Sequence, residues 1–447
     1  MSELLQHLKQ HLGERPQPLR LLVALSGGLD SVCLLHGVQQ LRRRGELDCS
    51  LRAIHVNHGL QPEAGAWQGF CETFCAGLGV PLVTSRLNLD PKKLQGNLEE
   101  KARHARYAEF ERKLGAGEIL LLAHHLDDQL ETFLLRLMRG AGLQGLSGMP
   151  QGRKLGHNSL LRPLLQLGRE QLREYANSAG LRWNDDPSNE DTSLDRNFCR
   201  HELLPLVESR WPEYRDSTAK SLSLLDEAVT LVNELAASDL ATVATAQGGV
   251  IELSPLMALT RARQRNLLRF WLKHLGLEVP GWHRLHQLVA EVLPAAADSN
   301  PELAEAGYRL CRFNNRLYAL LEKPHLPPEQ TAGWNPLTEK MLPLAGNGVL
   351  QAVSSSEHAL DANIGELQVR YRDGGESLQM PGRPNKALKE ILREAGVEPW
   401  LRDRVPLLYR GEQLVCVPGI GVAVTHAALP DTAGLQILWQ QPKLLAG

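Results

Sequence analysis

The stretch Ser26-Gly27-Gly28-Leu29-Asp30-Ser31 follows an apolar run, residues 21–25, that predicts a buried strand. Residues 31–41 predict a helix, so the stretch is a turn from the carboxyl end of a strand to the amino end of a helix. Free N–H groups and the positive end of the helix dipole converge at such a turn, and phosphates bind there. The two glycines leave room for a close ligand, both serines add hydroxyl donors, and the aspartate can hold Mg²⁺ between phosphate oxygens.

The common nucleotide-binding motifs do not match this turn. A Walker A loop ends in Gly-Lys-Ser/Thr, and the dinucleotide fingerprint spaces its glycines as G-x-G-x-x-G. The turn instead resembles the PP-loop of ATP pyrophosphatases, which split ATP between its α- and β-phosphates. This resemblance implies that residues 26–31 bind ATP.

Size and composition indicate a soluble protein of about two or three domains, because 447 residues exceed one ordinary core. Residues 1–20 resemble neither a secretory signal nor a membrane anchor, and no later apolar run approaches spanning length. The seven cysteines include no CxxC pair, which is typical of reduced thiols in the cytoplasm. A net charge of −2 excludes a uniformly basic nucleic-acid binder but allows local basic patches.

The first half of the chain alternates strand-like runs with helix-length segments, which predicts a parallel sheet covered on both faces. The expected strands are residues 21–25, 50–56, 81–86 and 119–123. Polar clusters follow the first, second and fourth of them, at 26–31, 55–59 and 124–128. Because ligands bind beyond the carboxyl ends of such strands, we expect the three clusters to meet in one crevice. His55 and His58 either line it or are satisfied by the backbone.

The later chain changes character. Long helices are expected at 219–236 and 255–275, the proline-rich stretch 324–328 indicates a linker, and the last hundred residues favour strands. We therefore predict an α/β fold with a parallel-sheet, Rossmann-like PP-loop domain, a helical middle domain and a small β-rich α+β carboxyl-terminal domain. The predicted boundaries are 1–216 for the first, 217–325 for the second, 326–350 for a linker and 351–447 for the third.

An acidic helix is predicted after the fourth strand, with Asp127, Asp128 and Glu131 on the flank of an apolar stripe. Acidic residues at a helix start also favour the dipole, which explains part of this pattern. Three carboxylates beside a triphosphate repel one another unless a cation lies among them, so we expect Mg²⁺ or a substrate ammonium group there. His124 and His125 lack the partners that a zinc site needs. Between residues 179 and 196, the polar loop 184–191 is typical of a surface turn.

Several arginines remain open to two interpretations. Arg103, Arg106 and Tyr107 share one face of a predicted helix, 99–114, with Glu99, and are either surface groups or site residues. Two basic groups lie later in the chain, and each is either a solvated face or a nucleic-acid contact. They comprise Arg261, Arg263, Arg265, Arg269 and Lys273 in the first, and Arg370, Arg372, Arg383, Lys386, Lys389, Arg402, Arg404 and Arg410 in the second.

Taken together, the motifs resemble the tRNA(Ile)-lysidine synthase family over nearly the whole chain. The motifs are SGGLDS, HVNHGL, LAHHLDDQLETFLLRLMRGAGLQGLSGM, LLRPLL, DDPSNEDTSLDRN and the late RYRDGGE with LKEILREAGVEPWLRDRVPLLY. The turn alone is shared with other ATP pyrophosphatases, whereas its combination with the acidic helix and the late Gly-Gly-Glu segment is far more specific.

The resemblance implies an ATP-dependent ligase that joins free lysine to C2 of the wobble cytidine in a CAU-anticodon tRNA(Ile), through an adenylated base. It implies ATP binding by residues 26–31 and His55, Mg²⁺ at Asp30, and lysine binding by Asp128 and Glu131. Arg103 and Arg196 would assist with phosphate or adenylate charge. Contacts to the tRNA are expected from Arg261, Arg265, Arg269, Arg370, Arg372 and Lys389. A cytoplasmic location follows, and a homodimer stays open.

Three alternative functions have different sequence requirements. A PP-loop tRNA thiolase needs cysteine pairs, and Cys71 and Cys75 are wrongly spaced and lack a third partner. An amidating ligase normally carries a glutaminase part, which the sequence does not indicate. An RNA-binding protein that is regulated by a nucleotide but has no catalytic activity would not require Asp30, Asp128 and Glu131.

Overall fold

The computed structural model describes residues 1–57, 59, 63–87, 98–296, 301–322, 332–355, 359–361, 363–429 and 432–446, with the side chains of 98–100 left out. The chain divides into two compact units, Met1–Leu231 and Val232–Gly447. No helix in the described ranges is both long enough and apolar enough to cross a membrane.

The first unit is built on a six-stranded sheet in the order β3-β2-β1-β4-β6-β5. Its strands are β1 (Leu19–Ala24), β2 (Cys49–Asn57), β3 (Leu82–Arg86), β4 (Ile119–Leu121), β5 (Gly152–Leu155) and β6 (Asn158–Leu161). All neighbouring pairs are parallel except β5 with β6, which form an antiparallel hairpin. The predicted parallel sheet is therefore confirmed, with this hairpin added at its edge.

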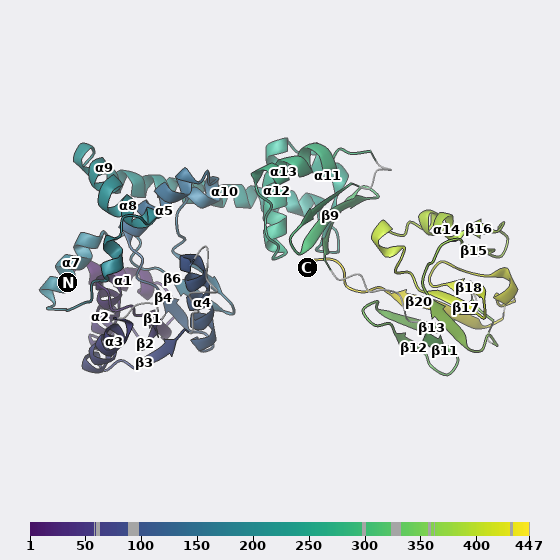
Figure 1. The fold of residues 1–447 in the computed structure, drawn as a ribbon, viewed down its shortest axis with the longest axis horizontal. Helices are drawn as coiled ribbons and strands as arrows, with labels where there is room; N and C mark the ends of the chain where they lie inside the picture. Colours follow the sequence, from purple (N-terminus) through teal and green to yellow (C-terminus); the bar gives the residue numbers. More distant parts are fainter. Residues whose placement is uncertain are drawn as a thin grey trace. The chain divides into compact units, whose positions relative to one another are not determined.

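Helices cover both faces of this sheet: α1 (Glu3–Gly13), α2 (Leu29–Arg43), α3 (Ala64–Leu78) and α7 (Arg169–Ser178) pack on one face, and α4 (Leu98–Lys113) packs on the other (Figure 1). The further helices are α5 (Leu126–Met138), α6 (Leu143–Leu146), α8 (Asp195–Phe198), α9 (Leu204–Arg210) and α10 (Tyr214–Val243), and residues of α5, α9 and α10 form a separate apolar cluster. Alternate strand residues explain the two faces: Leu21 and Val23 pack with α1, α2, α3 and α7, whereas Leu22 and Ile54 pack with Phe110 of α4. Two short turns, a 3-10 helix at Pro187–Glu190 and a π-helix at Cys199–Leu203, flank α8.

The second unit begins with helices and an antiparallel sheet in the order β7-β10-β9-β8. Its elements are β7 (Val250–Glu252), α11 (Leu253–Ala258), α12 (Arg261–His274), α13 (Trp282–Gln287), a π-helix (Leu288–Val292), β8 (Glu302–Glu305), β9 (Tyr308–Phe313) and β10 (Arg316–Leu321). The expected helix 255–275 is two helices, because Leu259 is extended and the Thr260 hydroxyl caps α12 at Arg263 N–H. The helical region thus carries a small sheet that the sequence did not reveal.

The rest of the second unit is β-rich, as predicted. Its elements are β11 (Ala332–Trp334), β12 (Met341–Pro343), β13 (Val349–Ser355), β14 (Leu367–Arg370), β15 (Ser377–Leu378), β16 (Lys386–Ala387), α14 (Leu388–Glu394), a 3-10 turn (Pro399–Leu401), β17 (Leu407–Arg410), β18 (Gln413–Val417), β19 (Gly421–Val422), a 3-10 turn (Val424–His426) and β20 (Gly434–Gln440). Residues 332–350, which the sequence places in a linker, contain β11, β12 and the start of β13. Residues 323–331 of the expected linker lie outside the described part. All seven cysteines are buried and unpaired with one another.

Candidate active site

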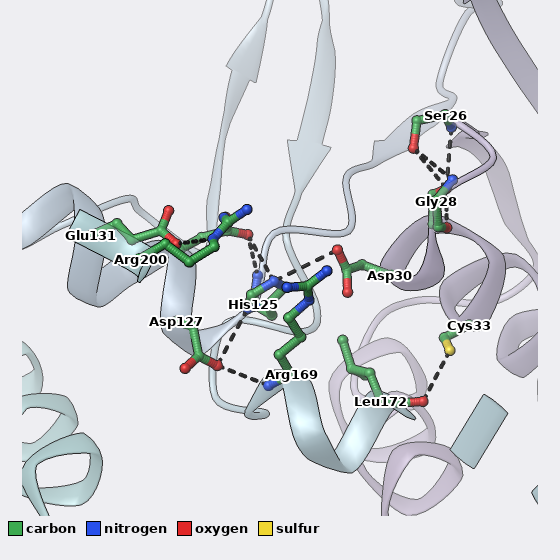
Figure 2. Close-up of polar contacts among 12 residues, drawn as sticks. Ser26, Gly28, Asp30, Cys33, His125, Asp127, Glu131, Arg169, Leu172 and Arg200 are labelled. Atoms are coloured by element: carbon green, nitrogen blue, oxygen red, sulfur yellow. Dashed lines mark hydrogen bonds and ion pairs between the residues drawn. The ribbon is translucent and has the colours of Figure 1, made fainter. Parts of the chain in front are cut away.

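The glycine turn joins β1 to α2 as the sequence predicts, and its hydroxyls organise it (Figure 2). Gly28 is the extended N-cap residue of α2, and its N–H donates to Ser26 Oγ at 3.3 Å. Ser31 Oγ donates to the Gly28 carbonyl at 3.0 Å, and it also accepts from Ser26 N–H at 3.2 Å. The turn therefore leaves the first N–H groups of a buried helix at the edge of a crevice, which is a geometry that suits phosphate oxygens.

Gly27 is required at its position for two reasons. Its φ is +91°, and a Cβ there would lie 3.2 Å from Cys71 Sγ and 3.3 Å from Asn184 Nδ2. Its carbonyl accepts from Asn184 N–H at 2.9 Å, which ties the loop that begins at Asn184 to the turn. The loop 184–191 is thus part of the site rather than the plain surface turn that its composition suggests.

A cavity of about 470 Å³ lies where the carboxyl ends of β1, β2 and β4 meet. Of the predicted site residues, it is lined by Ser26, Gly28, Leu29, Asp30, Ser31, His55 and Asp128. Gly27, Arg103, Glu131 and Arg196 are not among the described lining residues. Unpredicted or unassigned lining residues include Trp67, Arg106, Tyr107, His124, His125, Arg169, Asn184, Asp185, Asp186, Asn189 and Arg200. The expected meeting of three polar clusters in one crevice is confirmed.

His55 lines this cavity from the end of β2. Its Nδ1 lies 2.9 Å from the Leu25 carbonyl and 3.4 Å from Cys71 Sγ. Burial lowers the pKa of His55, although the hydrogen bond to Leu25 opposes this, so the ring is neutral at pH 7. The neutral ring that donates from Nδ1 leaves Nε2 as an acceptor. His58 lies outside the described residues.

His125 lies at the centre of the acidic groups (Figure 2). It is the N-cap residue of α5 and only 2% exposed. Its Nε2 lies 3.6 Å from Asp30 Oδ2 and 3.6 Å from Asp128 Oδ2, and its Nδ1 lies 3.7 Å from Asp127 Oδ2. One imidazole therefore lies between the aspartate of the glycine turn and two aspartates of the acidic helix, within ion-pair range but beyond hydrogen-bond distance.

Arginines from α8 and the π-helix bind the remaining carboxylate oxygens of α5. Arg196 donates from Nε to Glu131 Oε2 at 2.6 Å and from Nη2 to Asp128 Oδ1 at 2.8 Å. Arg200 donates from Nε to Glu131 Oε1 at 2.7 Å, as Figure 2 shows. Burial alone would raise the pKa of Asp128, but the charges of His125 and Arg196 hold it well below its usual range. Asp128 is therefore ionised at neutral pH.

Asp127 has a structural role on the other side of α5. It accepts from Arg169 N–H at 2.8 Å, at the start of α7, and from Arg215 Nε at 3.0 Å, near the start of α10. These contacts hold α5, α7 and α10 around the site. Arg169 and Arg200 gave no motif signal, except that Arg200 lies one helical turn after Arg196.

Asp30 offers an oxygen that a cation could use. Its Oδ1 is buried and has no hydrogen-bond partner among the described residues. Burial raises the pKa of Asp30, and nearby Asp128 adds to this while His125 opposes it. A carboxylate oxygen without a partner fits Mg²⁺, which prefers hard oxygen ligands and usually keeps waters or phosphate oxygens as the others. Among the described residues, no three or more His, Cys, Asp or Glu side chains are placed so that together they could hold a metal ion.

The predicted RNA contacts lie in the second unit and differ in their surroundings. Arg261, Arg265 and Arg269 are on α12, where Arg261 also donates from Nη1 to the Val289 carbonyl. Arg370 forms a two-pronged pair with Glu412 at 2.9 and 3.0 Å, and Arg372 lies 3.5 Å from Asp403. Lys389 is exposed on α14.

Three family models match successive parts of the chain. A PP-loop domain model covers residues 1–207, a TilS substrate binding domain model covers 252–318, and a TilS substrate C-terminal domain model covers 367–439. The first of these contains every residue of the cavity described above.

Curated relatives align with the chain over almost its full length. The chain is 40% identical to a tRNA(Ile)-lysidine synthase of Pseudomonas putida over 432 residues, which covers 94% of this chain and 95% of that protein. It is 38% identical to proteins of the same name from Coxiella burnetii and Shigella flexneri, with 94% of this chain and 93% and 96% of those proteins covered.

Proposed function

The chain belongs to the tRNA(Ile)-lysidine synthase family, and from this membership we propose which of its residues carry the family's reaction. The reaction joins lysine to C2 of the wobble cytidine in a CAU-anticodon tRNA(Ile) and converts ATP to AMP and pyrophosphate. The observation that supports the assignment most strongly is that the glycine turn, Asp30 and Asp128 line one cavity of about 470 Å³.

In the first step, the cytidine O2 attacks the α-phosphorus of ATP, and pyrophosphate leaves. We assign the leaving pyrophosphate to the N–H groups at the start of α2 and to the hydroxyls of Ser26 and Ser31. These donors are fixed by the turn before ATP arrives, so they stabilise the developing charge without reorganising. His55 completes the nucleotide site through its free Nε2 acceptor.

Asp30 is the residue that we propose to hold Mg²⁺, because its buried Oδ1 has no other partner in the described part of the protein. When bound, Mg²⁺ neutralises charge on the phosphate oxygens during displacement.

In the second step, the neutral ε-amine of lysine attacks C2, and AMP leaves with the former O2. The attacking nitrogen loses a proton, so the adduct gains a C–N bond and loses a C–O bond. We propose that Asp128 binds an ammonium group of lysine, since its carboxylate lines the cavity and stays ionised. A carboxylate whose pKa is so low is a poor proton acceptor, so its role is to bind the cation.

Glu131 supports this step through the arginines. It is 0% exposed, and both its oxygens accept from Arg196 and Arg200. We therefore propose that Glu131 acts on lysine by positioning these guanidinium groups and, through Arg196, Asp128. Arg196 then lies beside the place where the adenylate forms, and Arg103 adds positive charge from α4.

A thiolase mechanism is disfavoured by the cysteines nearest the site. Burial raises the pKa of Cys71 to about 12 and that of Cys75 to about 11. Both are therefore protonated at neutral pH, whereas sulfur transfer needs a thiolate.

The partners of the reaction support further proposals. ATP, lysine and tRNA are cytoplasmic, so we propose that the protein is cytoplasmic.

A homodimer is also proposed, supported by large apolar side chains exposed at Phe198 and Trp211 in the first unit. Light scattering that finds only monomer at working concentrations would remove the dimer without touching the activity.

One incubation tests the activity. The full chain is mixed with ATP, labelled lysine and separately purified tRNAs, and the labelled nucleotide is mapped. We expect label only at the wobble cytidine of the CAU-anticodon isoleucine tRNA, with AMP release that requires both lysine and that tRNA. AMP release without lysine incorporation would contradict the assignment.

A further inference from the structure

A second group of cations lies around Tyr107, apart from the glycine turn and the acidic helix. We call Arg103, Tyr107, Arg153 and Arg162 the arginine–tyrosine cluster. Its members come from three places: α4 supplies Arg103 and Tyr107, β5 supplies Arg153, and Arg162 directly follows β6. Arg162 belongs to the LLRPLL motif, which has no role in the mechanism above.

Arg162 is a buried cation that the protein satisfies only in part. It is 2% exposed, its N–H donates to the Gln151 carbonyl at 2.8 Å, and its Nη1 donates to the Pro150 carbonyl at 2.8 Å. Its Nε is buried and has no hydrogen-bond partner within the described ranges. A guanidinium so placed normally pairs with an anion, because burying an uncompensated charge is costly.

The other cations gather on the phenol ring. The Cζ atoms of Arg153 and Arg103 lie 5.1 and 5.6 Å from the Tyr107 ring centroid. Burial would raise the pKa of Tyr107, but the charges of Arg162, Arg103 and Arg153 lower it overall. Three guanidinium groups therefore act on one phenol, and the charges of Arg153 and Arg103 also repel Arg162.

No described Asp or Glu lies within ion-pair distance of any of these three arginines. By contrast, Arg52 on β2 of the same sheet has a carboxylate partner. Its Nε and Nη2 donate to the two oxygens of Glu118 at 2.6 and 2.5 Å. The cluster also borders the cavity, since Tyr107 lines it and the charges of Arg162 and Arg103 act on His124, another lining residue. What the cluster lacks is an anion at the cavity's edge.

We propose that the arginine–tyrosine cluster binds a phosphodiester of the RNA, next to the nucleotide whose base enters the cavity. Guanidinium groups bind phosphate oxygens in pairs, and the buried charge of Arg162 adds to the positive potential behind Arg103 and Arg153. Arg103 and Arg153 are exposed, so a strand can reach them from solvent, whereas the phosphates of ATP already have the N–H groups of the glycine turn. This inference rests on the proposed function insofar as RNA is the substrate.

The test is a double-mutant cycle, in which an arginine of the cluster is replaced in the protein and one phosphate of the RNA is replaced by an uncharged methylphosphonate. The RNA is a short hairpin with a CAU loop, made either natural or with one methylphosphonate beside the wobble cytidine. Its Kd is measured for the wild-type full chain, Arg153→Gln and Arg162→Gln by fluorescence anisotropy. Arg173→Gln is the control, because it removes the same charge from an exposed site on α7, where Arg173 pairs weakly with Glu170 at 3.8 Å.

We expect natural RNA to bind Arg153→Gln and Arg162→Gln roughly tenfold more weakly than it binds the control. At one position, the methylphosphonate should weaken RNA binding by the wild-type protein. The same methylphosphonate should hardly affect RNA binding by Arg153→Gln, because this variant has already lost its contact with that phosphate. ATP should bind all four proteins equally when RNA is absent. Arg153 is exposed, so its variant keeps the test valid if the buried Arg162→Gln fails to fold.

Two results would overturn the proposal. One is equal RNA affinity for Arg153→Gln and Arg173→Gln, together with full sensitivity of Arg153→Gln to every methylphosphonate. The other is weakened ATP binding with unchanged RNA binding, which would show that the cluster holds a nucleotide phosphate. Failure of the proposed function is separate, because it would appear as absence of lysine incorporation by wild type.

Discussion

Arg196 Nε donates to Glu131 Oε2 at 2.6 Å, across 65 residues of sequence, and this contact joins the acidic helix to the segment that follows the polar loop. The same guanidinium reaches Asp128, and Arg200 holds the second oxygen of Glu131. Two carboxylates and two guanidinium groups thus balance in charge beside the cavity. Any cation that binds Asp128 shares this carboxylate with Arg196.

Glu131→Gln should cost stability as well as activity. It leaves two guanidinium groups beside a buried, neutral side chain, and breaking a buried pair in this way costs about 3–5 kcal/mol. The measurement is urea unfolding of wild type and variant. Glu170→Gln, in an exposed pair on α7, is the control and should change the free energy of unfolding by less than about 0.5 kcal/mol. Equal stability of the two variants would show that the pairs around Glu131 contribute little.

Asp128→Asn should separate lysine binding from ATP binding. The amide keeps the shape but loses the charge, so we expect the lysine KM to rise by about 10- to 100-fold while the ATP Kd changes little. Single-turnover lysidine formation at varied lysine gives the first value, and equilibrium dialysis gives the second. Asp195→Asn is the control, because that carboxylate is exposed in its contact with Arg139. Normal lysine dependence in Asp128→Asn would refute the role of this residue.

Gly27→Ala should impair ATP binding, and Gly45→Ala should not. Both glycines have positive φ, +91° and +67°, so each alanine costs about 1–2 kcal/mol of backbone strain. A Cβ at Gly27 would also crowd Cys71 and Asn184, whereas nothing lies within 4 Å of one at Gly45. Calorimetric titration with ATP distinguishes them. If both variants lost affinity equally, general strain and not the shape of the turn would be responsible.

The elements that the sequence predicted well are those set by local pattern. The strands of the parallel sheet, the glycine turn and the acidic helix each rest on apolar spacing and turn residues within a short window. The hairpin β9–β10 carried such a signal too, because Asn314 and Asn315 both have positive φ, as a tight hairpin turn requires. That pair in the sequence could have revealed the sheet in the helical region.

The features that escaped prediction depend on partners far along the chain. Residues 332–334 contain a glycine and precede a proline, which is typical of a linker, yet they form β11 because β14 pairs with them. Arg200 has no motif of its own and matters only because folding places it on Glu131. Likewise, the polar loop 184–191 lines the cavity because Asn184 N–H donates a hydrogen bond to the Gly27 carbonyl. Tertiary pairing, not local propensity, decides such positions.

His124 should make stability depend on pH. Burial, together with the nearby arginines, lowers its pKa to about 3, while the unfolded chain keeps about 6.5. Between these values the unfolded state binds more protons, so the free energy of unfolding falls as pH falls below about 6.5. Because the ring is not fully buried, we expect a loss of about 1–2 kcal/mol from pH 7 to 5. Unfolding of His124→Asn should show a smaller loss than wild type, because other buried histidines such as His55 still contribute, while His157→Asn, at an exposed turn, should keep the wild-type loss. An equal pH dependence in all three proteins would contradict the prediction.

Arg269→Gln should weaken RNA binding more than Arg370→Gln does. Burial lowers the pKa of Arg269 and the charge of Arg265 adds to this, and no described carboxylate pairs with either, so a phosphate would relieve their repulsion. Arg370 must first break its ion pair with Glu412, and the cost of this offsets part of the free energy that a phosphate contact would provide. Binding of full-length tRNA at several salt concentrations measures the difference, since each phosphate contact contributes about 0.9 to the slope of log K against log salt. Arg269→Gln should reduce that slope by about 1, and Arg370→Gln by less. Arg316→Gln, whose arginine pairs with Glu252 at 2.9 Å, is the charge control. A slope that stays unchanged in Arg269→Gln would place the RNA away from α12.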